Sequence, residues 1–583
     1  MRSAGGPEFL SIVLYGLLAL TAYLPVLPWQ KNRVPWCACD DTAQSIWFLR
    51  WTPFAVSHGH NPFVSNWIDV GSGVNLMRNA SMPLLGSLMA PLTLTRGPVA
   101  SYNFLLWLGI ASSATACFLV LRHVVHWTPA AFLGGLMYAF TSYMAGQGLG
   151  HLNLVFVPVP PIMMYVLYEL LVLQRNSARR WGIGLGLLAA AQLLISAEIL
   201  VDSAVIGVIG VLVLVAAHPA LVADRWRHAL RGGAWGVVAA TPFVAYPLDV
   251  YFRGPQRFTG PVWHGLTYPM DLLNTFVPTV NQRLTTMGWA SLGDRLQPNL
   301  PESGGYLGIP LVLLLIFFVV RHRQVVAMRF ATAMAAAAWL LSLGPRLIVD
   351  GHVTVIPLPF DLFVHLPIFN SLLAGRFTLF VDLFVGFVLG IGVDRLHTDL
   401  GRVTRKTSEI VNGTFIGLIM LVTLFPLLPR WPYPHVTVDS TTSSFFQSKA
   451  VDDIPDGRAV LTYPYPVFPE NQAMLWQAVS SMRFRILGGF AFVPGADNSA
   501  SPGPAAVYPA AVPNTLIADY DGRANLGPAA TPTDVRALVA RYGISSIVVG
   551  NGGAFPGAAI ALFTDTYGPP RTVGGVALWS PLP

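Results

Sequence analysis

The chain has 583 residues, of which 54% are hydrophobic and only 11% are charged. This composition lies far from that of a soluble protein and indicates a polytopic α-helical membrane protein. The net charge of +7 is compatible with nucleic-acid binding, but the arginines fall mainly in short clusters between apolar segments, which is how membrane proteins encode orientation. We therefore expect no nucleic-acid partner.

The three cysteines are Cys37, Cys39 and Cys117, and they form no zinc-type pattern. Cys37 and Cys39 are too close in sequence for an easy mutual disulfide, and Cys117 lies inside an apolar segment. We therefore expect no redox chemistry.

Apolar segments recur along the first 430 residues, and about 11 of them are predicted to cross the membrane. The first is expected to be a retained anchor, since no cleavage site of small residues follows it. The predicted segments are 9–27, 102–121, 129–145, 152–173, 181–196, 199–217, 232–248, 306–320, 330–343, 377–393 and 410–428.

The short loops fix the predicted orientation, because their basic residues all fall on one side if the N-terminus is cytoplasmic. The long segments 28–101, 249–305 and 344–376 then face the outside, as does everything after Arg430. We therefore expect a multi-pass plasma-membrane protein, with a transmembrane domain over 1–430 and an external domain over 431–583. The basic residues are Arg122, Arg175, Arg179, Arg180, Arg225, Arg227, Arg231, Arg321, Arg323, Arg395, Arg402, Arg405 and Lys406.

Outside the apolar segments, the sequence predicts two kinds of structure. Segments 82–94 and 359–369 are short, amphipathic and interrupted by prolines, which is typical of helices that lie on a membrane surface. Beyond Arg430, strand-like runs at 458–463 and 544–550 and a capped helix at 531–542 predict a small external α/β domain.

The cytoplasmic side has only short loops and little room for a nucleotide-binding domain. The chain contains no G-x-x-x-x-G-K-[ST] sequence and no Gly-rich turn from strand to helix in a soluble region. If the chain is an enzyme, its activated substrate is expected to arrive through the lipid.

The segment 36–51, with sequence WCACDDTAQSIWFLRW, places Asp40 and Asp41 before an aromatic run. The spacing of that run fits a helix at the membrane surface, which would hold the two carboxylates where lipid meets water. A solvated loop that begins with Asp41 as a helix N-cap is the alternative.

Further polar groups lie at the predicted external mouths of apolar segments, where they are costly. Glu198 and Asp202 are four residues apart and share a helix face, so they are suited to bind a cation, share a proton or pair with an arginine, or else simply favour a helix N-terminus. His151 and Asn153 follow a glycine-rich turn, where the histidine would contact a phosphate, transfer a proton or occupy an ordinary interfacial position. Asp382, inside a predicted span, is expected to pair with a neighbouring helix.

Several arginines are predicted to gather at the same external surface. An arginine presents a planar fork suited to phosphate oxygens, so they could hold a lipid phosphate or pyrophosphate. Ordinary contact with headgroups is the preferred interpretation for Arg253 and Arg257, but not for Arg376. The other candidates in these loops are His264, Arg283, Arg295 and Glu302.

An acidic pair in the first external loop, a surface helix after it, about 11 spans and an external C-terminal domain together resemble the GT-C superfamily of membrane glycosyltransferases. Short strings add to the resemblance, which covers about residues 1–430. They are Asn61-Pro-Phe, Gly73-Val-Asn-Leu, Gly150-His-Leu, Glu302 with Tyr306-Leu-Gly, Ser342-Leu-Gly-Pro and Gly375-Arg-Phe.

The resemblance implies transfer of a sugar from a polyprenyl-phosphate donor to an envelope glycan, lipid or protein acceptor on the external face. It also implies that an acidic residue of the first external loop is the general base of an inverting reaction. That role falls on Asp41 or Asp40, with Asp41 preferred because it adjoins the predicted surface helix. Arg376, His151 or Arg283 would stabilise the charge of the departing phosphate.

No extended set of metal ligands accompanies the acidic pair, so no cofactor is expected with certainty and a divalent cation remains open. Two alternative functions remain as well. A transporter or flippase of a lipid-linked saccharide would use the same mouth residues, although the sequence shows no inverted repeat and few ionisable groups near mid-membrane. A non-catalytic envelope scaffold would explain the large external segments.

Overall fold

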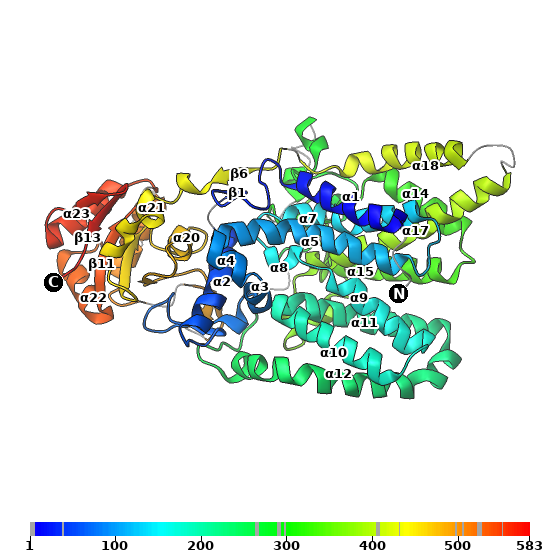
Figure 1. The fold of residues 1–583 in the computed structure, drawn as a ribbon, viewed down its shortest axis with the longest axis horizontal. Coiled ribbons are helices and arrows are strands. Elements are labelled where there is room, and N and C mark those ends of the chain that lie inside the picture. Colours follow the sequence, from blue (N-terminus) through cyan, green and yellow to red (C-terminus); the bar gives the residue numbers. More distant parts are fainter. Residues whose placement is uncertain are drawn as a thin grey trace.

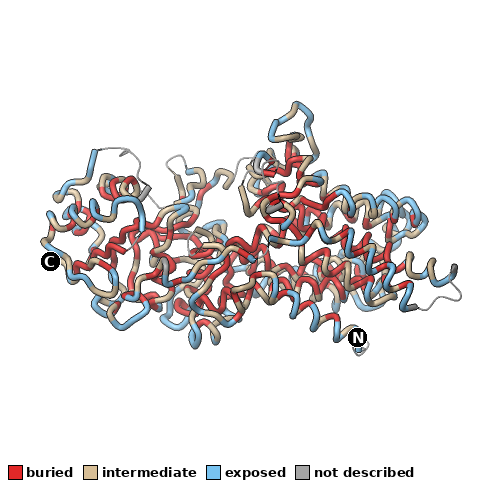
Figure 2. Tube along the Cα trace, turned by 90° about the horizontal axis from the view of Figure 1, so that it is seen from above, coloured by how far each residue is buried: buried red, intermediate tan, exposed pale blue. Residues whose placement is uncertain are grey.

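The computed structural model describes residues 6–37, 40–262, 267–287, 293–296, 299–403, 409–430, 432–495, 498–503, 507–521, 528–550 and 552–583. A bundle of long helices forms one end of the molecule and a sheet with its covering helices forms the other (Figure 1). Buried residues run through both parts and continue between them (Figure 2).

A helix overlaps each of the predicted apolar segments. Among the described residues, five helical segments are long and apolar enough to cross a membrane, namely Pro98–Leu121, Leu152–Leu173, Ala197–Ala217, Ala374–Arg402 and Ile410–Leu427. The shorter apolar helices there are Gly6–Ala22, Ile309–Arg321 and Val326–Ser342. The total of about 11 crossings therefore remains a prediction. The bundle helices are α1 (Gly6–Ala22), α5 (Pro98–Leu121), α6 (Thr128–Ala139), α9 (Val159–Tyr168), α10 (Ala178–Ile195), α11 (Ala197–Ala217), α12 (Pro219–Arg253), α14 (Ile309–Arg321), α15 (Val326–Ser342), α17 (Thr378–Val403) and α18 (Glu409–Leu424).

Glycines let α10 and α12 approach each other closely. A Cβ added at Gly182 would lie 2.1 Å from the carbonyl oxygen of Gly232, and one at Gly186 would lie 2.0 Å from that of Gly236. Both helices thus carry two glycines four residues apart at their contact, the spacing that allows membrane helices to pack backbone against backbone.

The arginine-rich connections meet at one end of the bundle. Arg122 pairs with Glu8 at the start of α1 (3.2 Å), and Arg321 pairs with Asp399 on α17 (3.0 Å). Asp394 accepts hydrogen bonds from the backbone N–H groups of His126 and Trp127, at 3.0 and 2.7 Å. These contacts bring together loops that the charge pattern assigns to the same side.

Helix α2 (Asp40–Ser57) lies between the bundle and the C-terminal part (Figure 1). Thirteen of its 18 residues are buried, because the bundle contacts it on one side and α20 (Gln472–Val479) contacts it on another. The irregular spacing of its apolar residues follows from this burial on several faces, so α2 is not a surface helix with one lipid-facing side. Asp41 lies inside the first turn rather than at the N-cap.

The C-terminal part contains a five-stranded sheet in the order β12-β13-β11-β7-β8. β7 (Ala459–Tyr463) and β11 (Ile544–Val549) are parallel and buried, and they are the two strands predicted from sequence. α22 (Pro532–Tyr542) begins with a capping box formed by Thr531 and Asp534, so the predicted capped helix is also confirmed. The other strands of the sheet are β8 (Arg485–Ile486), β12 (Arg571–Val573) and β13 (Val576–Trp579), and the flanking helices are α21 (Ala511–Asp521) and α23 (Pro556–Tyr567).

The first loop is tied to the C-terminal part by a strand pair, in which β1 (Arg33–Pro35) is antiparallel to β6 (His435–Thr437). Within that loop the amphipathic segment predicted over 82–94 forms α3 (Pro83–Leu88) and α4 (Ala90–Arg96). The other amphipathic segment, predicted over 359–369, forms the single turn α16 (Asp361–Val364). The minor strand pairs are β2 (Val64–Ser65) with β3 (Val74–Asn75), β4 (Arg346–Val349) with β5 (His352–Pro357), and β9 (Phe492–Pro494) with β10 (Ala500–Pro502).

Cys37 is disulfide-bonded, whereas Cys117 is free and buried. Cys39 lies outside the described residues, so the expectation about a mutual disulfide between Cys37 and Cys39 stays a prediction.

The glycine contacts between α10 and α12 predict opposite effects for neighbouring substitutions. Gly182→Ala should destabilise the protein by about 1–3 kcal/mol, since the added methyl group meets backbone atoms. Gly184→Ala should be neutral or stabilising, because nothing lies within 4 Å of its added Cβ. Thermal unfolding of the purified proteins in detergent measures the difference, and equal melting temperatures would contradict the close packing.

Candidate functional site

The first turn of α2 holds the acidic pair, and the C-terminal part fixes where that turn begins. The backbone N–H of Asp40 donates to the carbonyl of Pro469 (3.1 Å), and the side-chain amide of Asn471 donates to the carbonyl of Asp40 (2.9 Å). Asp40 has a left-handed φ of 52°, an unusual conformation for a residue other than glycine. One segment distant in sequence therefore holds Asp40 and with it the start of the helix that carries Asp41.

His151 contacts Asp41 from the turn before α8 (Leu152–Val155). Its Nε2 lies 3.1 Å from Oδ2 of Asp41. Gly150 makes this approach possible, because its φ is 146° and an added Cβ would lie 2.9 Å from the Cβ of Asp41. Ser45, one turn along α2, donates to the carbonyl of Gly150 at 3.0 Å and closes the contact.

Gln147, at the end of α7 (Ser142–Gln147), determines which ring nitrogen of His151 faces Asp41. Its Nε2 donates to Glu302 Oε2 (3.1 Å) and to the carbonyl of Pro301 (3.2 Å). Its Oε1 is therefore the atom that meets His151 Nδ1, at 2.6 Å. Because an amide oxygen only accepts, Nδ1 carries the hydrogen, and the bond from Nε2 to an ionised Asp41 requires the doubly protonated ring.

The chain of contacts continues from Glu302 to Arg376 and Glu198. Arg376 Nη2 lies 3.0 Å from Glu302 Oε1, and Nη1 pairs with Glu198 Oε2. The Glu302 side chain is only 1% exposed and that of Arg376 only 9%, whereas 22% of Glu198 is exposed. A buried cation thus holds two carboxylates that come from different elements.

At its other end this network of contacts reaches solvent through Asp41, whose side chain is 25% exposed. Burial acts to raise the pKa of Asp41, but the charges of His151 and Arg376 and the hydrogen bond from His151 hold it below the usual range. Burial and the charge of Asp41 raise the pKa of Asp40 to about 7. Burial acts to lower the pKa of His151, but the adjacent Asp41 carboxylate raises it overall.

These shifts describe a carboxylate that stays ionised between two proton donors. Below about pH 7, Asp40 keeps its proton and its carboxyl group hydrogen-bonds to Asp41. The two carboxyl groups titrate as a coupled pair, with one proton released at low pH and the other near neutrality. The arrangement can accept a proton at Asp41, on the exposed end of an otherwise buried network.

Six residues predicted from the sequence thus meet in one network, while others lie beside or away from it. Asn153 is buried, and its amide donates to Ser196 at 3.5 Å, next to the helix that carries Glu198. Asp202 is 0% exposed, and neither of its carboxyl oxygens has a hydrogen-bond partner among the described residues. The six joined residues are Asp40, Asp41, His151, Glu302, Arg376 and Glu198, the last at the far end.

Arg283 is not part of this network. It is exposed at the start of a short 3₁₀ helix (Arg283–Met287), and its backbone N–H donates to the carbonyl of Leu428. Asp382 hydrogen-bonds to Thr141 before α7, as expected for a residue that pairs with a neighbouring element. His264 lies outside the described residues.

Sequence reasoning missed the role of Gln147. The signal was available, because Gln147 and His151 are four residues apart and so share one face of a helical turn. The contact between Gln147 and Glu302 could not be predicted from the sequence, because 155 residues separate the two.

The described residues include no group of three or more His, Cys, Asp or Glu side chains able to hold a metal ion. Within that part of the chain, Asp40 and Asp41 are joined to a histidine and not to a third carboxylate.

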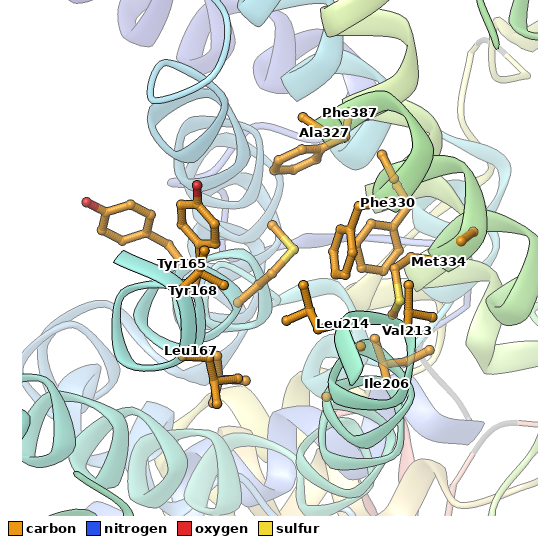
Figure 3. Close-up of a pocket in the computed structure, with 18 of the residues that line it drawn as sticks. Tyr165, Leu167, Tyr168, Ile206, Val213, Leu214, Ala327, Phe330, Met334 and Phe387 are labelled. Atoms are coloured by element: carbon orange, nitrogen blue, oxygen red, sulfur yellow. The ribbon is translucent and has the colours of Figure 1, made fainter. Parts of the chain in front are cut away.

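A cavity of about 760 Å³ begins close to this network and is almost entirely apolar. Phe380 on α17 lines it four residues after Arg376, which lies in the short 3₁₀ helix Ala374–Phe377 just before α17, and Ser203 lines it next to Asp202 on α11. Tyr165 and Tyr168 stand on one side of it, with Phe330 and Met334 on the other (Figure 3). The cavity therefore extends from the ionic network toward the arginine-rich end of the bundle, where it is lined by residues such as His123, Val124, His218 and Val325.

No family model and no curated protein matches the chain. Similar solved structures are glycosyltransferases of the GT-C fold. The oligosaccharyltransferase AglB from Archaeoglobus fulgidus, in complex with an inhibitory peptide and a dolichol-phosphate, shares 10% identity over 93% of this chain and 69% of its own, with a TM-score of 0.48. ArnT from Cupriavidus metallidurans, bound to undecaprenyl phosphate, shares 11% identity over 71% of this chain and 63% of its own, with a TM-score of 0.38. The arabinofuranosyltransferase AftD from Mycobacteria shares 12% identity over 94% of this chain and 37% of its own, with a TM-score of 0.46.

The contact between His151 and Asp41 predicts how the imidazole titrates. In the wild type its pKa should lie above the ordinary histidine range, and Asp41→Asn should lower it below that range, because the carboxylate is lost while the burial remains. NMR of ¹⁵N-histidine-labelled protein in nanodiscs measures this, with His151→Gln to assign the signal. Asp249→Asn, at an exposed ion pair on α12, serves as the matched control. An unchanged pKa in Asp41→Asn would contradict the contact.

Proposed function

We propose that the protein is a membrane glycosyltransferase that moves a sugar from a polyprenyl-phosphate donor to a cell-envelope glycan, lipid or protein acceptor on the external face. The observation that carries this proposal is an ionised, partly exposed Asp41, held at the end of a buried ionic chain that begins beside an apolar cavity. One end of the network suits a proton acceptor, and the other suits the phosphate of a lipid.

The proposed reaction is a single inverting displacement. An acceptor hydroxyl oxygen attacks the anomeric carbon of the sugar, the bond from that carbon to the phosphate oxygen breaks, and the electron pair of the broken bond leaves with the phosphate. The hydroxyl proton passes to Asp41, which acts as general base. Because a quarter of Asp41 is exposed, the proton can then return to water.

Asp40 and His151 would maintain Asp41 for this role. Both donate toward the carboxylate and so hold its orientation, and they keep its pKa low. A low pKa keeps the base ionised at neutral pH, at the cost of a weaker pull on the acceptor proton.

Arg376 remains our candidate for the donor phosphate. One nitrogen of its guanidinium pairs with Glu302 and another pairs with Glu198. Glu302 is fully buried and bound to Gln147, whereas Glu198 is partly exposed and its Oε1 has no hydrogen-bond partner among the described residues. We infer that Glu198 occupies the place that a phosphate oxygen takes when the donor binds.

The apolar cavity would then hold the lipid chain of the donor. Arg376 precedes Phe380 at the cavity wall by four residues, or about 6 Å along the helix axis. A cavity lined mainly by apolar side chains offers few hydrogen-bonding groups and therefore favours a hydrocarbon chain over water.

An external location for Asp41 belongs to the same proposal. The arginine-rich connections gather at the opposite end of the bundle, and the positive-inside rule assigns that end to the cytoplasm. The C-terminal part would then face outside together with the acceptor.

The proposal predicts the effect of removing the base. Asp41→Asn keeps the side-chain shape, so it should lower turnover roughly 10²–10⁴-fold while leaving expression and donor binding nearly intact. Transfer from a polyprenyl-phosphate sugar by purified protein in liposomes measures this, with Asp249→Asn as the control. Full transfer by Asp41→Asn, Asp40→Asn and the double variant would mean that catalysis lies elsewhere, with Glu198 as the next candidate. A wild type that transfers nothing but moves the lipid-linked sugar across the bilayer would be a transporter.

A further inference from the structure

A second pocket, of about 770 Å³, lies at the other end of α2 from Asp41. Phe54, His58, His60 and Trp67 of the first loop line one side, and segments 446–457 and 479–483 line the other. Phe54 follows Asp41 by 13 residues in the same helix, which is about 20 Å. The pocket is therefore separate from the proposed reaction centre but rigidly connected to it.

Aromatic side chains that pack against one another make up the first-loop side of this pocket. Phe54 stacks on His58 with centroids 4.3 Å apart, and Trp67 lies 4.8 Å from His60 and 5.1 Å from Phe54. Trp67 Nε1 donates to the carbonyl of Met482 at 3.0 Å, which fixes the indole plane. His58 and His60 are exposed, so their rings are accessible from outside.

Charged groups of both signs form the opposite side. Arg483 lies between Asp452 (3.6 Å) and Asp456 (3.9 Å), and its Nε donates to the carbonyl of Ile454 at 3.0 Å. Lys449 adds a second cation, so two cations balance two carboxylates among the described lining residues. This balance gives no preference for a phosphate-rich or polyanionic ligand.

Flat rings beside paired donors and acceptors match the chemistry of a sugar. A sugar ring presents C–H bonds on its faces, which pack on aromatic surfaces, and hydroxyl groups around its edge, which both donate and accept hydrogen bonds. A lipid chain would leave the charged groups without partners once they were covered. A concave site with aromatic walls and a few fixed polar groups is also typical of small-ligand sites.

We propose that this pocket binds a neutral oligosaccharide, namely a distal part of the acceptor glycan whose end reaches Asp41. The role of this oligosaccharide as an acceptor rests on the proposed function, whereas its binding to the pocket requires no transfer reaction. A helix that joins the two sites at a fixed separation would favour acceptors long enough to contact both.

The test is direct binding to the full-length protein in nanodiscs. The probes are neutral oligosaccharides several rings long, namely glucan, mannan and galactan fragments, followed by saturation-transfer NMR and titration calorimetry. At least one should bind the wild type and, equally, Asp41→Asn. The double variant His58→Ala/His60→Ala should bind it roughly tenfold more weakly. His352→Ala, at an exposed histidine on β5, is the matched control.

Trp67→Leu gives a second test, although it also removes core contacts. Arg483→Gln is therefore measured with it, because Arg483 lies on the opposite wall, and both variants should bind the probe less tightly. The absence of binding by every probe, equal binding by the double-histidine variant, or capture of a peptide at these residues would overturn the proposal. Binding without any transferase activity would leave the pocket assigned and reject the proposed function instead.

Discussion

The buried cation Arg376 is the constraint on which the rest of the site depends. Removing a guanidinium from water is costly unless carboxylates surround it, and here Glu302 and Glu198 do so. Glu302 in turn orients Gln147, which accepts a hydrogen bond from Nδ1 of His151 and so orients the ring that holds Asp41. The ionisation state of the partly exposed Asp41 carboxylate thus depends on the charge of Arg376, several contacts away. Loss of Arg376 would leave Glu302 and Glu198 without a compensating cation.

The helix α2 explains why this network can be rigid. It is enclosed by the bundle and by the C-terminal part, and its first turn is held through Pro469 and Asn471. Because both proposed sites lie on one helix, Asp41 at its start and the aromatic pocket at its end keep a fixed separation. A loop in this position would not keep that distance, since connecting segments are the more mobile parts of a fold.

Much of the fold could be predicted from sequence because it rests on local signals. Apolar length predicted the bundle helices, and the capping box at Thr531 predicted α22. The site could be predicted only in part. A buried charge is costly anywhere, so Glu302 and Arg376 were identifiable, but their pairing depends on packing between distant segments. The surface-helix interpretation of α2 was wrong because sequence cannot distinguish burial by protein from burial by lipid.

The most direct test of the central claim, that Asp41 takes the proton of the acceptor while Arg376 holds the donor phosphate, is a structure with a polyprenyl-phosphate sugar analogue and an acceptor bound. We predict an acceptor hydroxyl within about 2.6–3.2 Å of the Asp41 carboxylate. We also predict the phosphate on Arg376 in place of Glu198, and the lipid chain along Phe380. A phosphate bound at the arginine-rich end of the bundle, with no hydroxyl near Asp41, would contradict this account.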